Sequence, residues 1–388
     1  MPWVSLTSTP ELCPSCQVSL VTDADETPWC ERCEWNLDFV NPDPHRGRVG
    51  RMLDRWAFRV GFTSNRRLFK EISSRPIRRP EITPAFLLLL GVSLLLMGIF
   101  VSAIVSGLFL VIDGNPGLKL VGLFLLGFAF VFRPRIGRLK PYYEHYDEVT
   151  RGTAPHLFAL LDRSADAIGA RRPDHVFVSP EWNASADVVG LRRRKVLLLG
   201  LPLWVSSRPQ ERVFILGHEL GHFVNRDVRR GLLTQPACTM FANLADMVRP
   251  DTGRVSLEDD LGFGLLTKLA NMIARPFLWA LSYALLIVHI GMTMIAATDG
   301  QRAEYYADTL AMELAGTKAS TCLDLLNESF LTVVGARARG NHGFEDWRIA
   351  VEQARVGQME RLARLRQVSL RKEASPFHEH PPYGLRHR

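Results

Sequence analysis

The pentapeptide His218-Glu219-Leu220-Gly221-His222 has the pattern H-E-x-x-H. Residues four apart lie on one face of a helix, so the two imidazoles can bind the same zinc ion. The glutamate between them would lie beside the metal, where it can take a proton from a water molecule. The alternative is a buried amphipathic helix that happens to carry two histidines. The pattern predicts a zinc helix with His218 and His222 as ligands and Glu219 as general base.

The residues around this motif favour a buried helix. Residues 206–211 have the pattern of a helix start, with a serine cap, an early proline and an acid in the first turn. An apolar face follows, made of Val213, Phe214, Leu216, Leu220, Phe223 and Val224. Gly217 and Gly221 would let another backbone come close.

A catalytic zinc ion needs a third protein ligand. The best candidate is Glu304, in the segment Gln301-Arg302-Ala303-Glu304-Tyr305-Tyr306-Ala307-Asp308, which follows an apolar run and has a helical pattern. Glu304 and Asp308 share a helix face. This spacing suits a carboxylate ligand followed by a carboxylate that orients a ligand histidine. The alternative is a solvated acidic face.

The motifs occur together in an order that resembles the membrane zinc metallopeptidases of the HtpX and CAAX prenyl protease type. The shared elements are H-E-L-G-H-x-x-N-x-D from His218 to Asp227, E-Y-Y-A-D after a long apolar insertion, and H-P-P-x-x-x-R from His380 to Arg386. Asn183-Ala184-Ser185 is similar to the edge-strand segment of that family. One slot differs, because the family usually has arginine where this chain has Gln301.

The resemblance implies a zinc-dependent endopeptidase in which Glu304 completes the ligand set. His380 and Arg386 would lie near the zinc, where either could stabilise the oxyanion of the reaction. Residues 174–180 and 194–201 have the pattern of strands. An edge strand at Asn183, Ala184 and Ser185 would pair with an extended substrate backbone.

Four cysteines near the N-terminus form a second candidate metal site. They occur in two C-x-x-C pairs, Cys13 with Cys16 and Cys30 with Cys33. Two such pairs close a tetrahedral zinc site, and about forty residues cannot build an adequate core without such a staple. Two disulfides are the alternative. We expect a zinc ribbon over residues 1–40 with a structural zinc, and we expect its removal to leave peptidase chemistry largely intact.

Long apolar runs indicate a membrane protein. Residues 84–112 carry no charge and can span a hydrocarbon core of about 30 Å. With the second run, residues 118–132, they predict a transmembrane hairpin over 84–132, preceded by a basic linker or juxtamembrane segment at 41–83. The run at 276–298 would need a partner crossing at 231–248, which is weakly apolar. We expect four crossings. In the alternative, both segments pack on the peptidase domain at the membrane surface.

The basic residues set the expected orientation. The chain of 388 residues has a formal net charge of +7, and its arginines and lysines cluster beside the apolar runs. Positive-inside logic then places the N-terminus and the active site in the cytoplasm of a multi-pass protein of the cell (inner) membrane. Nucleic-acid binding is disfavoured, because few aromatic residues lie among the arginines.

The expected fold is a mainly α integral membrane protein. It would carry an α+β zincin-like metallopeptidase domain over residues 133–388, with a small sheet beside the H-E-x-x-H helix, and the N-terminal zinc ribbon with its four cysteine ligands. The expected function is cleavage of polypeptide substrates, membrane proteins among them, in quality control at the bilayer. The alternative is a membrane-anchored adaptor that recruits a protein or nucleic acid through its ribbon. An adaptor would not need the general base Glu219.

Overall fold

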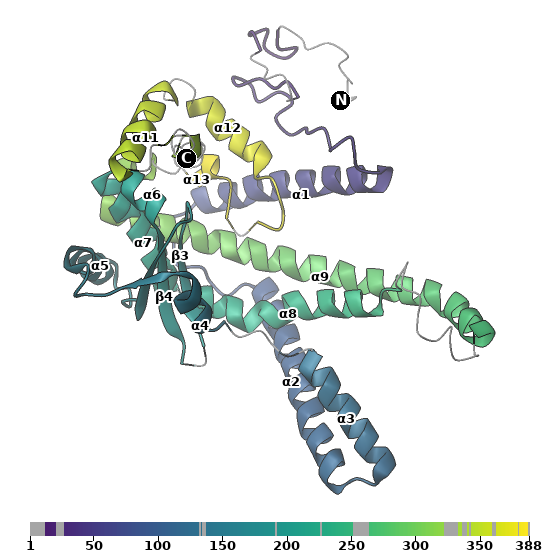
Figure 1. Ribbon diagram of the computed structural model, residues 1–388. Coiled ribbons are helices and arrows are strands. Elements are labelled where there is room, and N and C mark those ends of the chain that lie inside the picture. Colours follow the sequence, from purple (N-terminus) through teal and green to yellow (C-terminus); the bar gives the residue numbers. More distant parts are fainter. Residues whose placement is uncertain are drawn as a thin grey trace. The chain divides into compact units, whose positions relative to one another are not determined.

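The computed structural model describes residues 12–20, 27–131, 133, 137–190, 192–225, 227–250, 264–321, 333–335, 340, 343–358, 362–378 and 380–386. The chain divides into two compact units (Figure 1). Unit 1 comprises Met1–Pro80, Gly137–Val228 and Gly300–Arg388, and unit 2 comprises Glu81–Ile136 and Arg229–Asp299. Each unit is therefore built from segments far apart in the sequence.

Two apolar helices form a hairpin in unit 2 (Figure 1). They are α2 (Pro84–Asp113) and α3 (Pro116–Val131). The first begins with a proline behind Thr83, whose side chain accepts a hydrogen bond from the Phe86 amide at 3.1 Å. The helices pack closely where two glycines meet, because a Cβ atom on Gly122 would lie 2.7 Å from the Gly107 carbonyl oxygen. Small residues at such a crossing are typical of helices that pack in a membrane.

Two further helices contribute to unit 2, α8 (Asp227–Val248) and the first part of α9 (Gly264–Ala315). They are joined by polar contacts: the Ser282 hydroxyl donates to the Ala245 carbonyl at 2.8 Å, and His289 Nδ1 lies 2.5 Å from the Cys238 carbonyl oxygen. The histidine within the apolar run of α9 thus has a polar partner on α8.

Length and composition allow two helices in the described ranges to cross a membrane. These are α2 and the part of α9 from Ile273 to Ala315, and α3 is a shorter apolar helix. Large apolar side chains are exposed along α2 and α3, as expected of surfaces that contact lipid. The sequence predicts a further crossing at 231–248, but α8 is not among the described helices that are long and apolar enough to cross a membrane.

A four-stranded sheet lies in unit 1. Its strands are β1 (Asp147–Val149), β2 (His175–Ser179), β3 (Ala184–Val189) and β4 (Arg194–Gly200). The spatial order is β1-β2-β4-β3; β2 and β4 are parallel and the other two pairings are antiparallel. The strands predicted at 174–180 and 194–201 are thus confirmed, and β3 lies at an edge of the sheet. Tyr142 of α4 (Lys140–His145) packs on the buried Phe177.

The zinc-motif helix is α7 (Pro209–Asn225), which follows the short helix α6 (Leu201–Ser206) and contacts α5 (Pro155–Ile168) and β3 (Figure 1). The predicted serine cap is wrong. Ser207 caps the end of α6 by donating to the Leu203 carbonyl at 2.7 Å, and the start of α7 is held by the Arg208 amide, which donates to the Glu211 carboxylate at 2.8 Å. This is the backward half of a capping box.

The close backbone approach predicted at the two glycines of α7 is confirmed. A Cβ atom on Gly217 would lie 2.9 Å from the Ala311 Cα atom, and one on Gly221 would lie 3.0 Å from the Ala307 Cα atom. The second part of α9 therefore packs directly on the zinc-motif helix. Because Glu304 precedes Ala307 by less than one turn, this packing brings it to the two histidines.

The N- and C-terminal segments of unit 1 share one apolar cluster. It joins the ribbon, α1 (Arg48–Ser73), α12 (Leu362–Lys372) and α13 (Tyr383–Arg386); its members are Trp29, Leu37, Phe58, Phe62, Val368, Leu370, Ala374 and Leu385. The linker predicted at 41–83 is therefore largely a 26-residue helix, because Phe58 and Phe62 form an apolar face among the arginines. In the part of the chain that the structure describes, the remaining elements are the 3-10 helix η2 (Thr317–Thr321) and α11 (Phe344–Gln358).

Candidate metal centre

Three side chains with metal-binding atoms converge between α7 and α9. His222 Nε2 lies 3.2 Å from His218 Nε2, and each of these nitrogens lies 3.5 Å from a carboxylate oxygen of Glu304. All three ligand atoms lie within 4.8 Å of one another, and His218 and Glu304 are buried. The structure thus brings together the three residues that the sequence nominates as zinc ligands.

Asp308 holds His218 from the side opposite the other two ligands. Its Oδ1 atom accepts from His218 Nδ1 at 2.9 Å, and its side chain is 2% exposed. This hydrogen bond fixes the tautomer of the ring and leaves the Nε2 lone pair facing His222 and Glu304. The sequence predicts this orienting contact from the four-residue spacing of Glu304 and Asp308.

Arg386 reaches the site from the C-terminal segment. Its Nε donates to Asp308 Oδ2 at 2.6 Å and its Nη2 donates to Asp308 Oδ1 at 2.5 Å, which is a bidentate ion pair. Burial alone would lower the pKa of Arg386, but the charge of Asp308 outweighs it and raises that pKa, so the guanidinium stays charged. Its Nη2 atom also lies 3.7 Å from Glu304 Oε2 and 3.4 Å from His218 Nδ1. Arg386 thus lies beside the ligand set, and its role as an oxyanion donor stays a prediction.

His380 also contacts the ligand set. Its Nδ1 atom is 2.8 Å from Glu304 Oε2, while 71% of its side chain is exposed. The backbone around it is held by Gln301, whose amide donates to the His378 carbonyl and to Asn65 Oδ1, both at 3.0 Å. Gln301 is the residue that departs from the family pattern. It ties α9 to α1 and to the segment that carries His380 and Arg386.

Glu219 lies within the zinc-motif helix and is 6% exposed. Burial raises the pKa of its carboxyl, and positive charge on His218 and His222 opposes that rise. A carboxylate whose pKa is moved upward is better matched to proton transfer near neutral pH than a solvated one. The position and the direction of the shift suit a general base.

The donor set fits a zinc ion. Two imidazole nitrogens and one carboxylate oxygen are ligands that zinc accepts in catalytic sites, with a further position left for water or substrate. The three atoms already face one another, and Asp308 supplies the outer hydrogen bond that a ligand histidine normally makes. His218, His222 and Glu304 can therefore hold the metal without a change in the fold.

The substrate-binding segment predicted from sequence lies at the sheet edge. Ala184 and Ser185 begin β3, which pairs with β4 along one side, and Ala184 packs on the apolar cluster of α7 that includes Phe214. The Asn183 carbonyl accepts from the Gly200 amide at 2.7 Å. Within the described ranges, no strand pairs with the outer side of β3. That side can accept an extended peptide.

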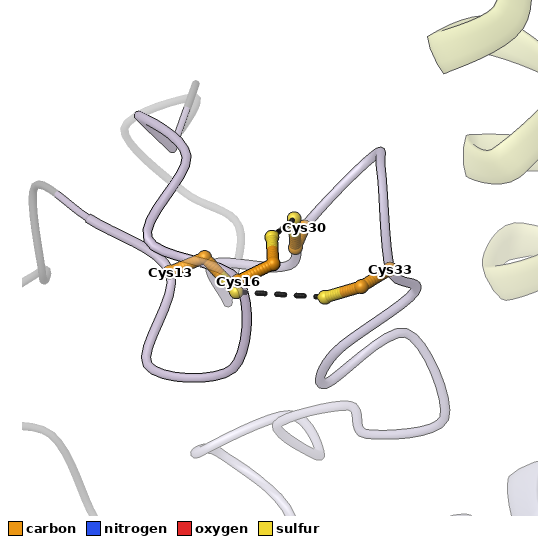
Figure 2. Close-up of side chains that lie close together, drawn as sticks. All are labelled: Cys13, Cys16, Cys30 and Cys33. Carbon is orange, nitrogen blue, oxygen red and sulfur yellow. Dashed lines mark hydrogen bonds between the residues drawn. The ribbon is translucent and has the colours of Figure 1, made fainter.

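The four N-terminal cysteines form a second group of metal-binding atoms, and Figure 2 shows their side chains turned toward one another. Their sulfur atoms lie within 4.8 Å of one another, with 3.6 Å between Cys13 and Cys33 and 3.4 Å between Cys16 and Cys30. All four are free thiols. Converging thiols without a disulfide are the donor set of a structural zinc site.

The two cysteine turns have matching backbones. The residues that follow Cys16 and Cys33 are Gln17 and Glu34, with φ angles of 58° and 57°. Their amides donate to the carbonyls of Cys13 and Cys30, both at 2.9 Å. Each turn thus presents its pair of thiols in the same way, as a zinc ribbon requires.

The ribbon is tied to the C-terminal segment by contacts that the sequence does not reveal. The Trp29 indole donates to Gln367 Oε1 at 3.0 Å, and the Gln367 amide donates to the Glu31 carbonyl at 2.7 Å. Arg371 donates to the carbonyls of Thr27 and Phe39 at 2.9 and 2.6 Å. More than three hundred residues separate these partners, so no sequence pattern predicts the contacts. The one available signal was a tryptophan beside a cysteine turn, because such a large apolar side chain is normally buried against another segment.

The comparisons with known proteins agree with this geometry. The family model described as peptidase family M48 matches residues 153–386, which contain the histidines of α7, Glu304 and Arg386. The chain belongs to peptidase family M48. It is 28% identical over 165 residues to "Protease HtpX" of Pseudomonas putida (strain GB-1), covering 42% of this chain and 52% of that relative.

A second relative matches over a longer part. This is "Protease HtpX homolog" of Desulfatibacillum aliphaticivorans, 26% identical over 212 residues, which cover 53% of this chain and 63% of the relative. The chain thus spans about half to two thirds of the length of the curated relatives that it matches. No solved structure matches the chain.

Proposed function

We propose that this chain is a zinc-dependent endopeptidase bound to a membrane. The observation that carries the proposal is the convergence of His218 Nε2, His222 Nε2 and the Glu304 carboxylate within 4.8 Å, beside the buried Glu219. Membership of a peptidase family agrees with it. We assign one catalytic zinc to this group and one structural zinc to the four cysteines.

The side chains have separate tasks in peptide hydrolysis. A zinc ion held by the three ligands would supply Lewis-acid chemistry, polarising the scissile carbonyl and acidifying a water molecule. Glu219 takes the proton of the attacking water and delivers it to the leaving amine. Asp308 keeps His218 in the tautomer that can bind metal, and Arg386 holds Asp308 in place. His380, exposed beside Glu304, is the better placed of the two C-terminal residues to meet the oxyanion.

The edge of β3 is the proposed substrate site. An extended peptide that pairs with it would make main-chain hydrogen bonds at Ala184 and Ser185. Main-chain pairing tolerates many side chains. The enzyme would accordingly cleave polypeptides of varied sequence, which suits quality control of membrane proteins.

Membrane attachment rests on the apolar helices of unit 2. The helix α2 has 30 residues, a length of about 45 Å at ~1.5 Å per residue, which exceeds the hydrocarbon core of about 30 Å. Arginines and lysines flank the hairpin on both sides, so both of its ends would face the cytoplasm. The catalytic centre would lie on that side. Labelling of residues 249–263 from each side of the membrane tests whether α8 and α9 add two further crossings.

The test compares paired variants. Glu219→Gln should bind as much catalytic zinc as the wild type but hydrolyse casein at least ~100-fold more slowly, because the base is lost while the ligands remain. The matched control is Glu313→Gln, a residue of α9 away from the ligand set, which should hydrolyse normally.

A metal-ligand pair completes the design. His222→Ala should lose the catalytic zinc, whereas His156→Ala, an exposed histidine of α5, should keep it. Substantial hydrolysis by Glu219→Gln at full zinc content would refute the assignment of the base. An inactive wild type with both metals bound would favour the adaptor alternative.

A further inference from the structure

The first half of α1 carries an apolar stripe that is exposed. Its members are Val49, Met52, Leu53 and Trp56, which are 67%, 58%, 53% and 41% exposed. They follow the i, i+3, i+4, i+7 spacing that places side chains on a single face of a helix. Four large apolar residues at this spacing normally form the face by which a helix packs. Here they are turned toward solvent.

The helix already uses a different face to pack on unit 1. Phe58 and Phe62 belong to the apolar cluster shared with the ribbon and α12, and a Cβ atom on Gly61 would lie 2.7 Å from the backbone of Ala374 and Ser375. At 3.6 residues per turn, this packed face lies roughly opposite the stripe. The stripe is therefore a second apolar face and not a frayed part of the first.

Positive charge borders the stripe. Residues 48–60 contain four arginines, at 48, 51, 55 and 59, and a single acid, Asp54, which is paired with Arg46 at 2.6 Å. By helical geometry all four arginines lie along one side of the stripe. Arg48 and Arg55 are exposed. The face is thus apolar in its centre, cationic along one border, and carries a tryptophan.

We propose that this face of α1 docks on the surface of an anionic lipid bilayer. Apolar side chains at helical spacing enter the boundary between headgroups and acyl chains, arginines contact the phosphates, and tryptophan favours that boundary. Each basic residue near an anionic leaflet adds to the attraction. A protein partner is the weaker alternative, because the row of arginines along one border matches the phosphates of an anionic leaflet, and the next helix in the chain, α2, is long and apolar enough to enter a bilayer.

The order of the chain supports a bilayer as the occupant. Only residues 74–83 separate α1 from α2, and they can span at most about 35 Å when fully extended. These ten residues include Arg75, Arg78 and Arg79. If α2 enters the bilayer, as the proposed function holds, this connection allows α1 to reach the same surface. The docking proposal rests on that part of the proposed function and not on the peptidase chemistry.

Quenching of Trp56 fluorescence tests the proposal on the full chain. The protein is reconstituted in nanodiscs whose anionic phospholipids carry bromine on their acyl chains, and the Trp56→Phe spectrum is subtracted to isolate this residue. We expect the difference spectrum to be quenched by the brominated lipid and protected from aqueous iodide. Quenching by iodide alone would show that the face is solvated. Protection from both quenchers would show that protein covers it. Either result overturns the proposal.

Two sets of variants separate the apolar and the electrostatic contributions. Met52→Asp should expose Trp56 to iodide, while Val356→Asp, at a residue of α11 that is 77% exposed, should leave its quenching unchanged. Arg48→Gln with Arg55→Gln should remove the preference for anionic over zwitterionic lipid. Casein hydrolysis and zinc content are measured in parallel. A wild-type protein that hydrolyses casein but whose Trp56 is not quenched by the brominated lipid refutes this inference and leaves the proposed peptidase function standing.

Discussion

Replacing Trp29 by alanine should weaken catalysis at a centre that Trp29 does not touch. The indole is 1% exposed and packs in the cluster that contains Leu385, the residue before Arg386. Arg364 and Arg371 lie over its ring, with 4.0 and 4.7 Å between each guanidinium carbon and the ring centroid. Loss of the indole removes the apolar surface against which α12 packs.

The connection from α12 to the metal centre is short. The Gly384 amide donates to the Ser369 hydroxyl at 2.9 Å, and a Cβ atom on Gly384 would lie 2.2 Å from the Arg366 carbonyl oxygen, so α13 lies directly on α12. Arg386 follows in α13 and holds Asp308. A shift of α12 therefore moves the guanidinium that fixes the orientation of His218.

The expected magnitude follows from burial. Truncating a buried tryptophan to alanine typically costs about 3–5 kcal/mol. If about 3 kcal/mol of this cost falls on the attachment of the C-terminal segment, its opening constant rises about 100-fold. Amide hydrogen exchange in residues 380–386 should speed up accordingly, and kcat should fall at unchanged catalytic zinc content. Trp29→Phe keeps the apolar contact and loses one hydrogen bond, so it should cost only about 1 kcal/mol.

Trp347→Ala is the matched control, because Trp347 is 8% exposed in a separate cluster with Val333 and Val351. It should destabilise the chain without accelerating exchange in the C-terminal segment. The reasoning is refuted if Trp29→Ala exchanges and turns over like the wild type, or no differently from Trp347→Ala. If Trp29→Ala behaves as expected, removal of the ribbon should also slow hydrolysis, contrary to the expectation from sequence, which stays untested.

Two further predictions concern stability. Glu211→Ala leaves the buried guanidinium of Arg355 (3% exposed) without its bidentate partner and should destabilise unit 1 by about 3–5 kcal/mol, measured by denaturant unfolding. Burial raises the pKa of Glu373 from 4.5 to about 7, so the folded state binds the proton more tightly than the unfolded state. The contribution of Glu373 to the free energy of unfolding is therefore complete below pH 4.5 and is lost as the pH rises to 7. Glu373→Gln should flatten the pH dependence of the free energy of unfolding between these values. An unchanged slope would contradict this assignment.

The parts of the site that depend on helical periodicity could be predicted. The four-residue spacing of His218 and His222 places two imidazoles side by side wherever a helix forms, and the spacing of Glu304 and Asp308 gives a ligand with an orienting carboxylate. Gly217 and Gly221 indicate close packing, although they do not identify α9 as the partner. In each case the chemistry follows from positions within one helix.

Contacts between distant segments could not be predicted in the same way. The bond from Trp29 to Gln367 joins residues at opposite ends of the chain, and no periodicity encodes such a pairing. The sequence pattern did not indicate the packed face of α1, because arginines lie between its phenylalanines and make the mean composition of the segment polar. Asn65, which binds Gln301 from the buried face of α1, carries no signal beyond a polar residue at an apolar spacing.

The continuity of α9 limits which peptide segments the proposed peptidase centre could cleave. The apolar run at 276–298 and Glu304 belong to one helix, so the ligand lies about 9 Å along the axis from the end of the run, at ~1.5 Å per residue. If the run crosses the bilayer, Glu304 follows within two turns of the same helix. A peptide bond would then reach Glu219 only in a segment that lies close to the bilayer or is drawn toward it. Loops next to the spans of other membrane proteins meet this condition without unfolding, whereas a folded soluble protein would have to present an extended segment to the edge of β3.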